Sequence, residues 1–167
     1  MPTREECIEA LRDVASSVSV VATDGAAGRH GATVSAFCSV STDSPKLLVR
    51  LRGASRILRT VLVHGQLCLN ALEQSADALA ERIAGRADTG VPDRFAGLPV
   101  VSQASLSPVP GVAARAFSCD VLDAIPSGSQ DFVIGRVRDV QSRGERPLTP
   151  LDGGYGSKFR QAAATQR

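Results

Sequence analysis

Hydroxyl side chains alternate with apolar ones along residues 31–45, GATVSAFCSVSTDSP. Read as one extended strand, this stretch presents a polar face and an apolar face, because successive side chains of a strand point in opposite directions. The polar face carries hydroxyls around one aromatic ring, at Thr33, Ser35, Phe37, Ser39 and Ser41. The apolar face, which we expect to pack on the core, carries Val34, Ala36, Cys38 and Val40. The alternation alone fits a ligand-binding strand and a solvated amphipathic strand equally well.

The turn RGAS, residues 52–55, is a second candidate site. Ser55 can cap the helix that follows, Gly53 frees the backbone, and Arg52 and Arg56 flank the turn. Unpaired amides at a helix start, together with guanidinium groups, suit an anion of the size of a phosphate. The alternative is an ordinary capped helix with solvated arginines, and the turn by itself leaves both interpretations open.

Hydrophobic periodicity and turn residues predict the elements that would hold these two stretches. Helices are predicted over 3–15, 54–65 and 75–85, with Thr3 capping the first, Gly65 ending the second and Ser75 capping the third. Strands are predicted over 17–24, 32–41, 46–52, 66–72, 100–107, 114–125 and 132–140, and a loop over 86–99. Because short strands outnumber the helices, the pattern favours a mainly β fold, closed as an antiparallel barrel, over a doubly wound sheet.

Composition excludes several classes of function. The chain has 167 residues, enough for one domain, with a formal net charge of +2 and scattered basic residues, so nothing favours binding to nucleic acid or to an anionic membrane. It has no long apolar run or export signal, and its four cysteines lie far apart, so we expect a cytoplasmic protein with reduced thiols. Its two histidines are too few for a zinc site, and the dinucleotide, phosphate-loop and serine-hydrolase motifs are absent.

Taken in order, these segments resemble the flavin reductases that supply reduced flavin to two-component monooxygenases. The resemblance is carried by G-x-T-V-S-A-F-x-S-V-S-x-D-x-P, LLVRLR, a Ser-led helix, QLCLNAL, RFAG, AFSCDVLDAIPSG, FVIGRV and PLTPLDGGYG. It spans roughly residues 8–158 and implies an FMN-binding split antiparallel β-barrel (α+β, mainly β) with a few short helices. We expect an N-terminal helix over 1–16, the barrel over 17–158 and a frayed tail over 159–167.

The resemblance also implies the site. The flavin ring would lie against one group of residues, namely Thr33, Val34, Ser35 and Ala36, and the cofactor would continue along Ser39, Val40 and Ser41. The flavin phosphate would bind at Arg52, Ala54 and Ser55, and Tyr155 would close the nicotinamide side. The cofactor would be FMN, with FAD possible, and the electron donor NADH or NADPH. Such proteins are homodimers with the flavin near the subunit interface, and the reduced flavin diffuses to a separate oxygenase.

One position departs from the family pattern. Where the family has Gly-Asp-His, this chain has Gly128-Ser129-Gln130, so Gln130 occupies the histidine position. Glutamine donates and accepts hydrogen bonds but carries no proton or charge near neutral pH. The substitution leaves two alternatives to an NAD(P)H:flavin reductase with catalytic Gln130 and Tyr155. They are a flavin-binding split-barrel protein with weak or no reductase activity, and an oxidoreductase acting on another substrate.

Overall fold

The fold is known from a computed structural model, which describes residues 17–85, 93–98, 100–101, 109–143, 148, 150–151 and 154–155. The strands are β1 (Ser19–Thr23), β2 (His30–Val34), β3 (Phe37–Ser41), β4 (Lys46–Arg52), β5 (Gln66–Leu72), β6 (Val100–Val101), β7 (Val109–Pro110), β8 (Ala113–Ser127), β9 (Gln130–Ser142), β10 (Pro150–Leu151) and β11 (Gly154–Tyr155). The helices are α2 (Arg56–His64) and α3 (Asp77–Ala84). The predicted helix at 3–15 and the tail at 159–167 lie outside the described residues.

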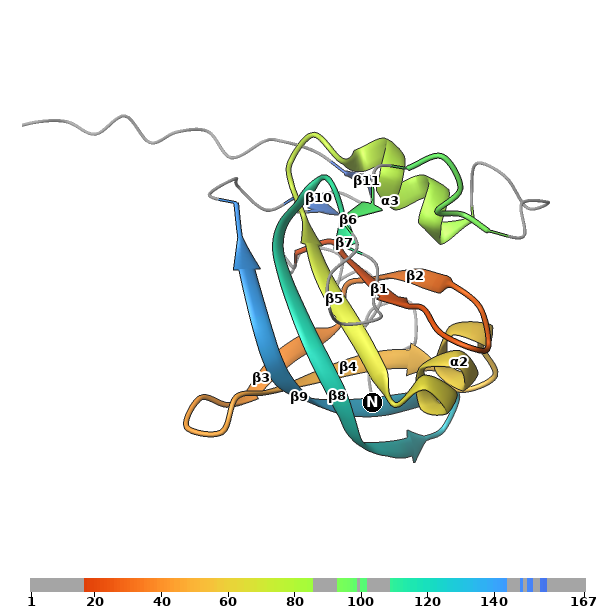
Figure 1. The fold of residues 1–167 in the computed structure, drawn as a ribbon, viewed down its shortest axis with the longest axis vertical. Helices are drawn as coiled ribbons and strands as arrows, with labels where there is room; N and C mark the ends of the chain where they lie inside the picture. Colours follow the sequence, from red (N-terminus) through yellow and green to blue (C-terminus); the bar gives the residue numbers. More distant parts are fainter. Residues whose placement is uncertain are drawn as a thin grey trace, which may run out of the picture.

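Seven strands form one antiparallel sheet in the order β2-β1-β5-β8-β9-β4-β3 (Figure 1). The two edge strands, β2 and β3, are consecutive in the chain, and only Ser35 and Ala36 separate them. Because two residues span only about 7 Å, the two edges of the sheet must come together. The sheet is therefore rolled into a barrel that is split between β2 and β3, which confirms the predicted mainly β split barrel.

The prediction of one strand over 32–41 is wrong. Val34, before the link, is 9% exposed in the barrel core, and Phe37, after the link, packs against the same core. These residues are three apart, so an uninterrupted strand would turn them to opposite faces. The link between the two sheet edges changes which side chains after it face the core. Cys38 and Val40, which were expected in the core, are therefore exposed.

The barrel core receives three side chains of helix α2, Ile57, Leu58 and Val61. The helix begins after Ser55 and ends at Gly65, whose φ of 65° is the left-handed conformation that glycine adopts without strain. The predicted helix over 54–65 is confirmed with both of its ends. Its N-terminus consequently lies where β4 ends.

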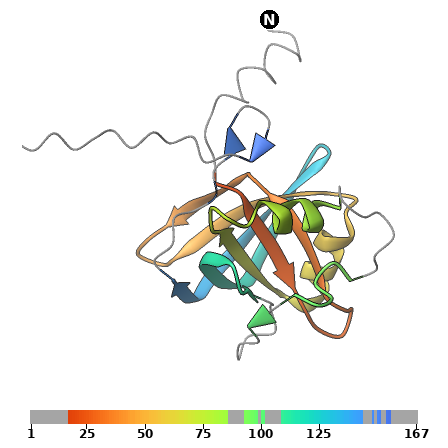
Figure 2. The same cartoon turned by 90° about the horizontal axis from the view of Figure 1, so that it is seen from above.

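Helix α3 covers a second apolar cluster on the outside of β1 (Figure 2). Leu79, Ala80 and Ile83 pack there against Val20. The expected cap at Ser75 is wrong, because the helix begins after Ala76 without a side-chain cap. The hydroxyl of Ser75 instead donates to Glu73 Oε1 at 2.7 Å.

The strands predicted in the second half of the chain are described over different parts of their lengths. Those predicted over 114–125 and 132–140 are confirmed and are longer, forming the β8–β9 hairpin. The strand predicted over 100–107 is described only at Val100–Val101, which pairs with β7. Residues 102–108 lie outside the described part of the chain.

Candidate functional site

The turn between β4 and α2 meets the turn between β8 and β9. The N–H of Gly53 donates to the carbonyl oxygen of Ser129 at 3.1 Å, and Arg52 pairs with Gln130 across the sheet. Arg52 and Ala54 are exposed, and Gln130 is half-buried. The structure thus brings together the predicted phosphate turn and the residue at the family's histidine position.

The start of α2 offers unpaired donors. Ser55 Oγ accepts from the N–H of Leu58 at 3.3 Å, and the N–H of Ser55 donates to Arg52 O at 3.0 Å. The first turn of α2 carries no acidic residue, and the N–H groups of Arg56 and Ile57 have no acceptor among the described residues. Two free amides beside two guanidinium groups fit an anion, so these residues fit a flavin phosphate.

The residues expected beside the flavin ring divide into groups with different surroundings. Thr33 donates its hydroxyl hydrogen to Ala80 O of α3 at 2.8 Å, and the side chain of Val34 belongs to the core. Ser35 is exposed on the link, and the carbonyl of Ala36 accepts from the N–H of Arg50 at 3.0 Å. The hydroxyl of Thr33 thus holds β2 against α3, so this hydroxyl already has a partner within the chain.

Ser39, Val40 and Ser41 lie at the far end of β4 from the RGAS turn. Ser39 lies opposite Leu47 and Ser41 opposite Lys46, with a bulge at Val40. Since Lys46 and Arg52 are six residues apart on one strand, the two ends are separated by about 20 Å. A ligand that meets both groups would have to lie along β4.

Tyr155 lies in β11, where its backbone pairs with Pro150 of β10. The position of its side chain relative to the RGAS turn lies outside the described part of the structure.

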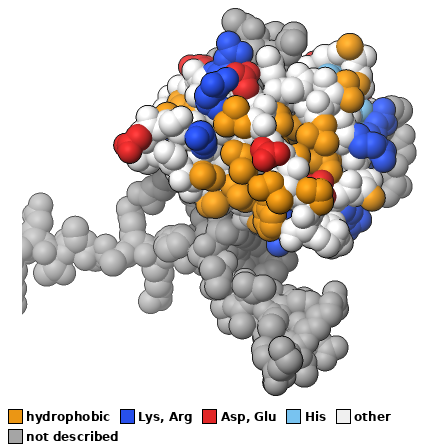
Figure 3. All heavy atoms as spheres, turned by 90° about the horizontal axis from the view of Figure 1, so that it is seen from below, with side chains coloured by type: hydrophobic (Ala, Val, Ile, Leu, Met, Phe, Trp, Pro, Cys, Tyr) orange, Lys and Arg blue, Asp and Glu red, His pale blue; other side chains and the backbone are white. Residues whose placement is uncertain are grey.

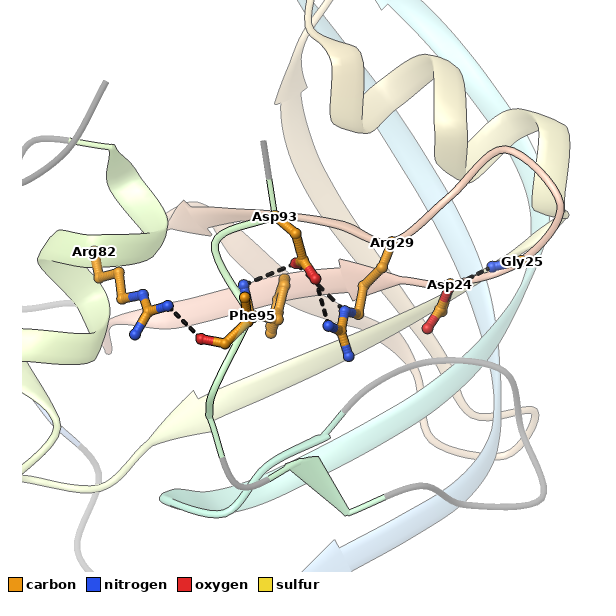
Figure 4. A network of polar contacts seen from close by, with 7 residues as sticks. Asp24, Gly25, Arg29, Arg82, Asp93 and Phe95 are labelled. Carbon is orange, nitrogen blue, oxygen red and sulfur yellow. Dashed lines mark hydrogen bonds and ion pairs between the residues drawn. The ribbon is translucent and has the colours of Figure 1, made fainter. Parts of the chain in front are cut away.

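One contact network was not visible to sequence reasoning (Figure 4). Arg29 forms an ion pair with Asp93 and lies over the ring of Phe95, 5.7 Å from its centroid. The hydrogen bond from Arg29 lowers the pKa of the Asp93 carboxyl below its ordinary value. Phe95 is 1% exposed and lies so close to Gly31 that a Cβ there would come within 2.6 Å of the ring. The network holds residues 93–98 against β2, and no local motif marks partners 64 residues apart.

A second unforeseen network joins the β1–β2 turn to the end of α2. The N–H of Ala27 donates to His64 Nε2 at 3.0 Å, and Thr23 Oγ1 lies 2.9 Å from Nδ1. Because the Thr23 hydroxyl donates its single hydrogen to Gln66 O at 2.8 Å, it accepts from Nδ1–H. In this arrangement His64 links the two elements through both ring nitrogens, with Nε2 as the acceptor.

Known proteins resemble this chain in sequence and in fold. The model of a protein family described as "Flavin reductase like domain" matches residues 11–158. The chain belongs to this family. The flavin reductase resemblance seen in the sequence is therefore confirmed over most of the chain.

Individual relatives agree with the family match. The chain is 33% identical over 144 residues to an FMN reductase (NADH) RutF of Ancylobacter novellus, covering 86% of this chain and 78% of that one. It is 32% identical over 155 residues to the protein of the same name from Klebsiella pneumoniae, covering 92% and 93%. The crystal structure of a putative flavin reductase from Haemophilus somnus superposes with a TM-score of 0.85 at 25% identity, covering 93% of this chain and 99% of that one.

Two further findings concern membranes and metals. None of the helices in the described part of the chain is long and apolar enough to cross a membrane. No cluster of metal-ligating side chains occurs within the described residues.

Proposed function

We propose that the chain is an NADH-dependent FMN reductase that releases reduced flavin to a separate oxygenase. The observation that carries the proposal is the hydrogen bond from Gly53 N–H to Ser129 O, because it holds the turn that would bind the phosphate beside Gln130. Family membership and the FMN reductase (NADH) relatives support the same activity. A related barrel that only stores flavin is not favoured by any contact described above.

The chain's own residues would bind and orient the substrates. Arg52 and the free amides at the start of α2 would hold the flavin phosphate, and the Ser35–Ala36 link would border the ring. FMN, when bound, supplies the redox chemistry by accepting a hydride from the nicotinamide. Gln130 would orient the nicotinamide through hydrogen bonds, without carrying a proton. Orientation of two bound substrates is then the main contribution of the protein to the rate.

We further propose that the protein is a homodimer. Large hydrophobic side chains are exposed on three strands, at Val40 (50%), Leu122 (45%), Ile125 (47%) and Val140 (53%). Figure 3 shows hydrophobic side chains gathered on one face of the molecule. Exposed apolar surface of this kind is typical of a contact between protein chains.

The activity is tested by mixing the purified protein with FMN and NADH without oxygen and following the flavin absorption band. We expect the band to bleach at a rate proportional to protein concentration. NADPH in place of NADH, and FAD or riboflavin in place of FMN, measure the preferences for donor and flavin. Tight FMN binding with no bleaching by either donor would contradict the reductase and favour a flavin-binding protein.

A further inference from the structure

The carboxylate of Asp131 lies directly against the RGAS turn. A Cβ placed on Gly53 would lie 2.7 Å from Asp131 Oδ1, so the carboxylate lies against the turn and would have to shift if residue 53 carried a side chain. Asp131 stands opposite Leu51 in the sheet and two residues before Val133, both of which belong to the barrel core. Asp131 therefore points to the inward side of the barrel wall, beneath the turn that would hold the phosphate.

This carboxylate has no neutralising partner among the described residues. No ion pair or hydrogen bond joins Asp131 to Arg52, to Arg56 or to any other described side chain. Asp120, by contrast, lies between Arg136 and Arg138 at 3.7 and 3.0 Å. The negative charge of Asp131 thus acts on its surroundings without a paired cation.

An anion held at this turn would feel that charge. Ala54 follows Gly53 directly, so its amide and the start of α2 lie within about 8–10 Å of the carboxylate. This separation is comparable to the Debye length at physiological salt, so the charge is only partly screened. Like charges at this separation repel, and the repulsion is stronger near a protein surface than in bulk water.

The geometry points to Asp131 as a specificity-determining residue that weakens the binding of the flavin phosphate, so that FMN exchanges as a substrate instead of remaining bound. This inference rests on the proposed function, which places the phosphate at the RGAS turn. A reductase that hands its product to another protein must release the flavin in each cycle. Repulsion of the phosphate speeds that release without changing the contacts that hold the ring.

The test compares Asp131→Asn with Asp139→Asn, a matched change on the same strand. Asp139 is exposed and eight residues away, about 26 Å along β9, so it alters net charge equally without approaching the turn. FMN and riboflavin affinities are measured by flavin fluorescence for both variants and the unmodified chain, at low and at high salt. Asp131→Ser serves as the second variant should the amide distort the turn.

We expect Asp131→Asn to bind FMN about three- to tenfold more tightly at low salt, with a correspondingly slower FMN dissociation rate. Riboflavin affinity should not change, and the gain for FMN should shrink at high salt. An unchanged FMN affinity, or an equal gain for riboflavin, would overturn the inference while leaving the reductase intact. Failure of the unmodified chain to bind either flavin would overturn the proposed function and this inference with it.

Discussion

Arg52 and Ser55 lie on one turn but differ in their other contacts. Ser55 caps α2, whereas the Arg52 side chain makes no hydrogen bond or ion pair with the described residues. Arg52→Ala should therefore weaken the affinity for FMN about ten- to a hundredfold, the equivalent of one charged hydrogen bond. The affinity for riboflavin should not change. Fluorescence titration with the two flavins measures this difference.

The matched control for Arg52→Ala is Arg136→Ala, at the opposite end of the β4–β9 pair. Loss of the Arg136 guanidinium should leave the affinities for FMN and riboflavin unchanged. Ser55→Ala should in addition lower the free energy of unfolding by about 1 kcal/mol, because it removes a helix cap. Equal weakening of FMN and riboflavin by Arg52→Ala would show that the phosphate binds elsewhere.

Gln130, across the sheet from Arg52, allows a test of proton chemistry beside this turn. Gln130→His should raise the rate of flavin reduction by NADH and introduce a pH dependence between about 5 and 8, where imidazole titrates. FMN affinity should hardly change, since the phosphate and ring contacts come from other segments. Stopped-flow absorbance without oxygen, run across pH, measures the rate. The same substitution at Gln141, eleven residues along β9, is the control.

A flat rate and a flat pH profile in Gln130→His would show that the neutral amide already fills the role of the family's histidine. Such a result would limit Gln130 to hydrogen bonding with the nicotinamide.

At the scale of elements, His64 fastens the β1–β2 hairpin to α2. His64→Ala removes the acceptor for the Ala27 amide and the donor to Thr23. We expect the free energy of unfolding to fall by about 1–3 kcal/mol and the Ala27 amide to exchange its hydrogen faster. Urea denaturation and hydrogen exchange measure the two effects. Val63→Ala, next in sequence and 70% exposed, should change neither.

Elements were predictable where their signals are local. Helix α2 was predicted with both ends because Ser55 and Gly65 supply the cap and the stop within the segment itself. The break at Ser35–Ala36 was not predictable, because alternation does not reveal which strand each half pairs with. Ser75 does not cap α3, because the helix begins one residue later and Ala76 stands at the cap position.

The candidate site was predictable in its segments but not in its contacts. The RGAS turn and Gln130 were both singled out from the sequence, yet their adjacency depends on pairing between β4 and β9. Asp131 was missed for the same reason, since only that pairing places its carboxylate against Gly53.

At the scale of the whole molecule, exposed apolar side chains on three strands predict a dimer. Light scattering should give twice the mass of the chain, and Ile125→Glu should shift the protein toward a monomer, because an unpaired charge is costly to bury. A monomer that binds FMN normally would contradict the dimer.

The pairing of β4 with β9 affects the order in which the protein folds. Lys46 pairs with Arg136, ninety residues later, whereas the β1–β2 and β8–β9 hairpins form between neighbours in sequence. Contacts between distant segments form slowly, so the pairing of β4 with β9 should be a late event in folding. Gly53 and Ser129 meet only once this pairing has formed. Flavin that binds at this junction would bind only chains in which the pairing has formed, and would therefore stabilise the folded state.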